Sequence, residues 1–427
     1  MFAPNCCSRL SASLWVTLAC FSPILASGCN DPSGPEPVTR IEALPRELTT
    51  AEREVVDAGD SFAFFFLAQI VASEDPGRNL FVSPLSASMA LGMALAGAEN
   101  ETYTAMRDAL GLDAMSREEI GASYHSLIEL LTGLDPSVRV KIGNSVWLGT
   151  GFDPESAYLE EVEADFEARV TTLEFDDPSA ADTINDWVAD ATDGLIDGIV
   201  TPPIDPDIVA FLINAIYFQG DWTVQFDPVD TRPGDFRRED GTVVTASMMR
   251  LSDGEFPFAL TPDYAAVELP YGGEAFAMTL VLPPEGQSLD DFVAQLDSES
   301  WADILASLSP HEPPVVLPRF TLEYEKQLNE VLKALGMEPA FDPFVADFSR
   351  LHRDALAMQL YISEAKQKAF VEVDEKGTKA AAVTSVSIKP TSAQLGFTAD
   401  RPFLFVIRER LSGTILFTGL VHDPTSD

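Results

Sequence analysis

Residues 375–394 read Glu375-Lys-Gly-Thr-Lys-Ala-Ala-Ala-Val-Thr-Ser-Val-Ser-Ile-Lys-Pro-Thr-Ser-Ala-Gln394. The even-numbered residues from Thr378 to Ile388 are all small or apolar, whereas the odd-numbered ones are largely polar. This period of two predicts a strand with one buried face. A glycine precedes the strand, alanines crowd its start, and Pro390-Thr-Ser follows it. The pattern fits a strand that can slot between others and is joined to an exposed turn, although by itself it favours a routine half-buried strand.

The residues on either side of this stretch favour a strand that can insert between other strands. Residues 370–382, Phe-Val-Glu-Val-Asp-Glu-Lys-Gly-Thr-Lys-Ala-Ala-Ala, closely resemble the proximal hinge of inhibitory serpins. Other segments resemble serpin signatures and follow one another in the family's order. They are residues 79–90 under the centre of the main sheet, 214–222 in its central strand, and the C-terminal signature at 400–405 and 417–424. The resemblance covers residues 52–424.

The resemblance implies the α+β serpin fold: a large central mixed β-sheet, two smaller sheets, eight or nine helices and an exposed reactive-centre loop. The residue patterns agree, because helical patterns concentrate before about residue 200 and strand patterns after it. Since no linker interrupts the sequence, residues 52–427 are expected to form a single domain. The individual elements expected are helices at 60–72, 86–97 and 184–194, and hairpins at 266–271 with 275–282 and at 403–408 with 414–421.

The resemblance also implies a function, inhibition of a serine endopeptidase by a suicide-substrate mechanism. The protease cleaves the exposed loop and forms an acyl-enzyme, and the loop then inserts into the main sheet before water can release the protease. The hinge must therefore carry small, uncharged side chains on its inward face, and Gly377, Thr378, Ala380, Ala381 and Ala382 satisfy this demand. The expected hinge also includes Glu375, the acid just before them.

Counting from the hinge with the family's usual loop length places the scissile bond between Thr391 and Ser392. A small residue before that bond suits an elastase-like or subtilisin-like protease and does not suit trypsin.

Two other sites follow from the resemblance. The shutter under the sheet comprises Ser83, Ser86, Asn214 and Gln367. Many serpins have histidine where Gln367 stands, and glutamine can still bond to Ser83 and Asn214 because it both donates and accepts. The breach, where the loop begins, comprises Arg319 and Trp222, and we expect Arg319 to form a salt bridge with the hinge glutamate.

The N-terminus predicts export. Residues 1–28 have a short apolar core that ends in small residues, as a signal peptide does. The sequence before Cys29 resembles a bacterial lipobox, so lipidation of Cys29 is expected, with an ordinary signal peptide as the alternative. All four cysteines lie within the first 29 residues, so the folded body has no thiol. Residues 29–51 are expected to be a flexible tether, and the protein to be lipid-anchored to the cell envelope or secreted.

The charge and the missing motifs exclude several classes of function. A net charge of −41 argues against binding of nucleic acid or anionic lipid, which leaves the N-terminal lipid as the expected membrane contact. No cofactor or metal is expected, and the expected partner of the monomer is a target serine protease, held covalently.

Two alternatives stay open. The first is an enzyme: Ser363-Glu-Ala-Lys366 matches the Ser-x-x-Lys pair of β-lactamases, but the rest of that signature is missing. The four histidines are expected to be ordinary surface or loop residues. The protein is therefore not expected to be an enzyme. The other alternative is a noninhibitory serpin that acts as a binding or carrier module.

Overall fold

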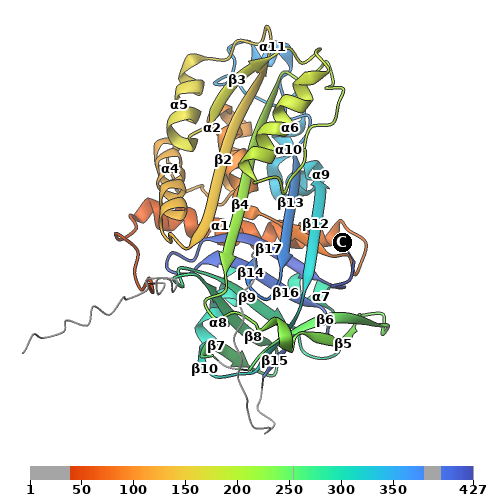
Figure 1. Ribbon diagram of the computed structural model, residues 1–427. Helices are drawn as coiled ribbons and strands as arrows, with labels where there is room; N and C mark the ends of the chain where they lie inside the picture. Colours follow the sequence, from red (N-terminus) through yellow and green to blue (C-terminus); the bar gives the residue numbers. More distant parts are fainter. Residues whose placement is uncertain (1–38, 253, 379–395, 427) are drawn as a thin grey trace, which may run out of the picture. The chain divides into compact units, whose positions relative to one another are not determined.

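The structure is a computed structural model that describes residues 39–252, 254–378 and 396–426 (Figure 1). They belong to one compact unit that begins at Val38. Three β-sheets of six, seven and four strands form the unit together with helices on their faces. The α+β class and the three sheets predicted from the sequence are confirmed.

The six-stranded sheet is the central one, and its strand order is β12-β13-β14-β4-β2-β3. Its two longest strands, β2 and β4, have twelve residues each and pair antiparallel over eleven positions. Because β2 and β3 are parallel, the sheet is mixed, as predicted. In chain order its strands are β2 (Val138–Gly149), β3 (Arg169–Leu173), β4 (Ala210–Asp221), β12 (Phe320–Gln327), β13 (Lys366–Val373) and β14 (Gly377–Thr378).

The other two sheets lie toward one end of the central sheet (Figure 1). The seven-stranded sheet, which has more strands than the central one, has the order β1-β17-β16-β9-β8-β7-β10, and the four-stranded sheet has the order β15-β11-β6-β5. Strands β9, β16 and β17 are buried along their whole length, and their sequences are accordingly mostly apolar. Both predicted hairpins are present as β8–β9 and β16–β17. The strands are β1 (Leu80–Val82), β5 (Arg232–Arg237), β6 (Val243–Leu251), β7 (Phe256–Leu260), β8 (Ala265–Tyr271), β9 (Phe276–Leu282), β10 (Ser309–His311), β11 (Val315–Pro318), β15 (Phe397–Thr398), β16 (Phe403–Glu409) and β17 (Ile415–Val421).

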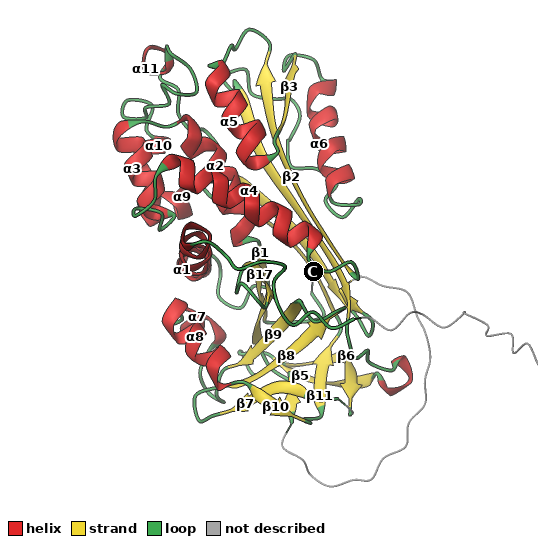
Figure 2. Cartoon of the chain, turned by 90° about the vertical axis from the view of Figure 1, so that its left-hand side faces the viewer, coloured by secondary structure: helices red, strands yellow, loops and turns green. Residues whose placement is uncertain are grey.

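The described residues contain eleven α-helical segments, more than the eight or nine expected, because four of them are only four or five residues long. Helices α2 and α4 lie on one side of the central sheet and α6 lies on the other (Figure 2). The predicted helices near 86–97 and 184–194 are α2 and α6. The segments are α1 (Thr50–Ala72), α2 (Pro84–Gly97), α3 (Asn100–Ala109), α4 (Arg117–Gly133), α5 (Ser156–Phe166), α6 (Ser179–Ala191), α7 (Leu289–Val293), α8 (Ser298–Ser307), α9 (Asn329–Leu332), α10 (Glu338–Phe341) and α11 (Ala355–Met358), with a 3₁₀ turn η1 (Pro228–Asp230) and a π turn η2 (Lys333–Met337).

Helix α1 begins ten residues earlier than the sequence pattern indicated. Thr49 and Glu52 form a reciprocal capping box at its N-terminus, whereas Asp60, the predicted start, lies in the helix interior. Among the described helices, α1 alone is long and apolar enough to cross a membrane, but half of its most apolar window is buried in the domain. It is a core helix.

The predicted tether at residues 29–51 is too long. The Ile41 amide donates to the Gly273 carbonyl at 2.7 Å, and Arg40 pairs with Glu274 at 3.0 Å. These contacts fix residues 40–41 against the turn between β8 and β9. The folded domain therefore starts at about residue 39. The Pro- and Glu-rich composition of this segment did not indicate this start, because its contacts are with residues more than 200 positions away in the sequence.

Candidate functional site

The central sheet has an opening between β13 and β4. Only the two-residue strand β14 lies between them, at one end of the sheet (Figure 1). Thr378 pairs with Val373 on one side and with Gly220 on the other, and Gly377 pairs with Asp221. Within the described residues, the facing edges of β13 and β4 make no other ladder pairing. The sheet therefore offers backbone donors and acceptors to one more strand.

A cavity of about 890 Å³ occupies the far end of this opening. Residues 208–215 of β4 and its approach line one side, and residues 358–368 before and within β13 line the other. Residues of α2 lie on one face of the cavity, and Ile196, Ile199 and Val200, which follow α6, lie on the other. The opening therefore passes through the sheet, and its walls are mostly apolar.

Gly377 lies where a larger residue cannot. Its φ is +156°, and a Cβ atom there would collide with the Gly220 carbonyl oxygen and approach the Asp221 Cα to 2.7 Å. These two atoms belong to backbone of the neighbouring strand, so neither can rotate away. Glycine therefore allows the chain to enter between β13 and β4.

Thr378 directs its side chain into the interior. It is 4% exposed, and its Oγ1 lies 2.8 Å from the hydroxyl of the fully buried Tyr271. Burial raises the pKa of Tyr271 far above its ordinary value, so the phenol stays protonated and hydrogen-bonded. The side chain of Thr378 therefore lies on the interior face of the central sheet.

The predicted salt bridge at the breach is present. Arg319 Nε donates to both carboxylate oxygens of Glu375 at 2.8 and 2.7 Å, and its Nη2 lies 2.5 Å from Oε1. Thr231 also donates to Glu375. The carboxylate is 4% exposed and the guanidinium 47% exposed. Burial acts to raise the pKa of Glu375, but the hydrogen bonds from Arg319 and Thr231 outweigh it, and the pKa lies below its ordinary value.

Trp222 holds the segment before the hinge against the end of β4. Its indole Nε1 donates to the Asp374 carbonyl at 2.9 Å, and its backbone amide donates to the Lys376 carbonyl at 2.5 Å. The ring stacks on Tyr271 with centroids 4.4 Å apart. One tryptophan and one ion pair therefore hold residues 374–376 in place.

The shutter differs from the prediction in one bond. Gln367 makes its hydrogen bonds with the Ser83 backbone, accepting at 3.1 Å and donating at 2.8 Å. Asn214 instead donates to Asn144 Oδ1 at 2.8 Å, and its own Oδ1 is buried with no described partner. Both described side-chain hydrogen bonds of Gln367 are therefore with Ser83, and none is with Asn214.

The two serines of the shutter join α2 to the sheets. Ser83 caps α2 by accepting from the Ser86 amide at 3.1 Å, and its hydroxyl donates to the Leu416 carbonyl. Ser86 donates weakly to the Asn214 carbonyl at 3.4 Å. The shutter therefore connects α2 with both β17 and β4.

Several predicted residues lie outside the described part of the chain. They are Cys29, Ala380, Ala381, Ala382, Thr391 and Ser392. Among the described residues, the sequence missed Tyr271, Thr231 and Asn144. Tyr271 ends a predicted strand, yet nothing in that pattern indicates that it faces the hinge.

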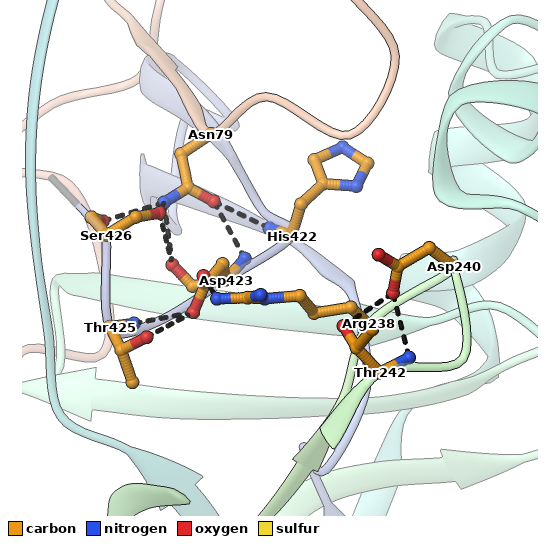
Figure 3. Close-up of polar contacts among 8 residues, drawn as sticks. All are labelled: Asn79, Arg238, Asp240, Thr242, His422, Asp423, Thr425 and Ser426. Carbon is orange, nitrogen blue, oxygen red and sulfur yellow. Dashed lines mark hydrogen bonds and ion pairs between the residues drawn. The ribbon is translucent and has the colours of Figure 1, made fainter. Parts of the chain in front are cut away.

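One of the histidines expected to be surface or loop residues is a loop residue that is buried. His422 lies just after β17 and is 3% exposed, and its Nε2 lies 3.1 Å from Asp290 Oδ1. Next to it, Asn79 accepts from the amides of His422 and Asp423, and Arg238 pairs with Asp423 (Figure 3). The cluster ties the end of β17 to the start of β1. Its burial depends on packing between distant segments, which no local pattern showed.

The serine and lysine of the Ser-x-x-Lys match do not meet in the structure. Lys366 Nζ lies within 3.7 Å of Glu325 and Glu364 and donates to the Ile199 carbonyl, so it is not directed at Ser363. In the described ranges, no group of three or more His, Cys, Asp or Glu side chains could hold a metal ion.

Comparisons with known proteins agree over nearly the whole chain. The family model described as "Serpin (serine protease inhibitor)" matches residues 57–424. Human neuroserpin is 34% identical over 81% of this chain and 86% of its own length. An uncharacterized serpin-like protein of Thermococcus kodakarensis is 32% identical over 92% of this chain and 93% of its own length.

Solved structures resemble the fold closely. The native structure of tengpin, a thermophilic serpin, superposes with a TM-score of 0.78 at 29% identity, covering 90% of this chain and 97% of tengpin. Human thyroxine-binding globulin in complex with thyroxine gives a TM-score of 0.80 at 28% identity, covering 88% and 100%.

Proposed function

The chain belongs to the serpin family, and we propose that it is an inhibitory member that traps a serine protease as a suicide substrate. The observation that carries this proposal is the opening between β13 and β4, with the hinge residues Gly377 and Thr378 already paired inside it. A loop that inserts as an extra strand requires an opening of this kind.

The register of β14 supports the proposal. Continued into the opening, the antiparallel pairing would bring Ala380, Ala382 and Thr384 opposite Phe218, Ile216 and Asn214 of β4. The incoming side chains are small or uncharged, so the strand can enter without burying a charge. Twelve residues of β4 would accommodate residues 377–388, and the added ladder hydrogen bonds would favour the inserted state.

The proposed reaction begins when the protease's serine hydroxyl attacks the carbonyl carbon of Thr391. The peptide bond to Ser392 breaks, the amine of Ser392 leaves with the proton that the serine hydroxyl gives up, and an ester joins Thr391 to the protease. The cut releases the hinge from its connection to β15. Insertion then carries the esterified end toward the far end of the sheet and distorts the protease before water hydrolyses the ester.

The choice of target follows from the residue before the cleaved bond. Thr391 is small and β-branched, which suits the shallow primary pocket of an elastase-like or subtilisin-like protease. We also propose that the protein is exported and either anchored through a lipid on Cys29 or secreted, so its targets are proteases outside the cytoplasm.

A gel assay tests the inhibitory function. The protein is mixed with an elastase-like serine protease, and the products are separated in SDS. An inhibitor leaves a stable complex of the two chains, whereas a noninhibitory serpin leaves only cleaved or intact chain. Thr378→Ser is the control because it keeps the hydroxyl that meets Tyr271, and it should form the complex as the unchanged protein does.

A further inference from the structure

Asp60 lies in the interior of α1, where this helix meets the turn between β16 and β17. A Cβ atom at Gly413 of the turn would lie 4.0 Å from Asp60 Oδ2 and 3.9 Å from Val56 Cγ1. The other carboxyl oxygen, Oδ1, is buried and has no hydrogen-bond partner among the described residues. A buried carboxylate needs several donors to replace water, so this site suits the uncharged acid better than the ionised one.

A second acid at the same turn shows how the fold supplies donors to a buried carboxylate. Glu409, at the end of β16, is fully buried and accepts from the amides of Leu411 and Ser412 at 2.7 Å each and from the Ser412 hydroxyl at 2.5 Å. Even with these donors, burial raises the pKa of Glu409 above its ordinary value. The described backbone donor near Asp60 is a single amide, that of Ile415, so a charge on Asp60 is less well supported than one on Glu409.

A small cavity lies beside Asp60, between α1, α2, α4 and the start of β17. Its volume is about 20 Å³, and most of the residues in its wall are apolar. Ser88 of α2, Tyr124 of α4 and Thr414 add hydroxyl-bearing residues to the wall. Burial raises the pKa of Tyr124 to about 12, so its phenol stays uncharged at neutral pH. An ionised Asp60 would therefore face a wall that contains no charged group from α2 or α4.

The charged groups that act on Asp60 come from its own helix and from β16. Burial has the largest influence and raises the pKa of Asp60 from 3.8 to about 7. Arg408 of β16 and the Ile415 amide of β17 oppose this rise, whereas Asp57, one turn earlier in α1, adds to it. Arg408 gives limited support because its guanidinium is bound to Glu268 of β8. The surroundings of Asp60 thus agree with its missing donors, and both favour the protonated acid.

We propose that Asp60 is a proton-dependent switch at the joint between α1 and the β16–β17 turn. With its proton, the side chain packs in the joint without charge. Without the proton, the carboxylate lacks donors there and favours opening of the joint toward water. The proposal goes beyond the inhibitory function and does not depend on it.

The direction of the pH dependence follows from the two protonation states. The folded chain holds the proton of Asp60 more tightly than the unfolded chain does. The joint should therefore be most stable below pH 3.8, lose stability as the pH rises toward about 7, and change little above that. Between pH 5 and pH 8 an acid with these two pKa values changes the ratio of closed to open joint at most about 100-fold. Because Asp60 is only partly buried, water reduces this effect, and we expect a change of about tenfold.

The experiment measures amide hydrogen exchange of the intact protein by mass spectrometry at several pH values from 5 to 9, corrected for the intrinsic effect of pH on exchange. The readout is the protection of peptides from α1 and from residues 409–415, which should fall about tenfold from pH 5 to pH 8. Asp60→Asn keeps the shape of the uncharged acid but cannot ionise, so most of this fall should disappear. Asp57→Asn is the matched control, because it makes the same change one turn earlier in α1 at an exposed position and should keep nearly the whole fall.

Two results would overturn the switch. One is a fall in protection that is as large in Asp60→Asn as in the unchanged protein, since the histidines, which also titrate in this range, are common to all three proteins. The other is an unchanged protein whose α1 and turn peptides keep the same protection from pH 5 to pH 9. The second result needs no variant, so it decides the matter even if Asp60→Asn does not fold.

Discussion

The breach ion pair provides the sharpest prediction for the native state. Glu375→Lys replaces a nearly buried carboxylate with an ammonium group facing Arg319. The carboxylate accepts hydrogen bonds from Arg319 and Thr231, and bonds to a charged group contribute about 1.5–3 kcal/mol when well formed. Because the guanidinium is half exposed, screening reduces this to about 1–2 kcal/mol. The hinge should then detach from its closed arrangement about 5–30 times more readily.

The assay is mild heating followed by native gels that separate native, latent and polymeric forms. Glu330→Lys is the control, since it makes the same charge change at a surface position where Glu330 is 84% exposed and pairs only with Lys333 among the described residues. We expect Glu375→Lys to convert faster than Glu330→Lys, and Glu375→Gln to fall between them because its amide oxygen can still accept from Arg319. Equal conversion of the Glu375→Lys and Glu330→Lys variants would refute the reasoning, since some other contact would then close the breach.

The remaining predictions concern pH, the hinge, the shutter and the N-terminus. The pKa of Glu375 is lowered in the folded protein, so the carboxylate should stabilise the fold fully above pH 4.5, its ordinary pKa, and lose this contribution as the pH falls below it. The melting temperatures of the unchanged protein and of Glu375→Gln should therefore converge at low pH. A difference in melting temperature that stays constant with pH would contradict this. Thr378→Arg should turn the inhibitor into a substrate that is cleaved without complex formation, because residue 378 already lies buried between β13 and β4 and an unpaired guanidinium there would hold the hinge out of the sheet. An undiminished complex on SDS gels would show that insertion does not need residue 378 inside the sheet. Thr384→Val should lower the melting temperature of the cleaved form relative to Thr384→Ser. The register of β14 brings residue 384 opposite Asn214, whose Oδ1 has no described partner and could accept from a hydroxyl there. Identical melting curves for the two variants would place residue 384 elsewhere. Cys29→Ser should release the protein from membranes or block its processing in cell fractionation, and unchanged membrane association would leave a different anchor to be found.

The hinge and breach could be predicted because their residues carry a demand that is visible in sequence. Gly377 must lack a side chain beside the Gly220 carbonyl, Thr378 must be small and uncharged, and Glu375 needs a cation. Arg319 could be matched to that acid only through the resemblance to known serpins, since 56 residues separate the two in the chain.

What the sequence missed depends on contacts between segments that are distant in the chain. Asn144 takes the amide of Asn214 that Gln367 was expected to hold, and this follows from the β2–β4 register, which neither strand's own pattern reveals. His422 is buried by Asp290 and its neighbours, although a histidine just after a strand resembles an ordinary surface residue. Local periodicity predicts which face of a strand is buried, but it does not predict which side chain lies opposite.

The start of the domain was misplaced for a related reason. Residues 39–49 have the composition of a tether, yet Ile41 joins the turn after β8, and the true cap of α1 is Thr49. Asp60 resembled a cap because a polar residue precedes the apolar run 62–67. It is instead a partly buried acid in the helix interior, and desolvation raises its pKa to about 7.

The most direct test of the account is mass spectrometry of the product formed with an elastase-like serine protease. The account predicts one covalent species whose mass equals the protease plus the chain truncated after Thr391, together with a released peptide that begins at Ser392. A shift of the junction by a residue or two would move the cleaved bond but keep the mechanism. Cleaved chain with free, active protease and no covalent species would contradict the claim that this protein is a suicide inhibitor.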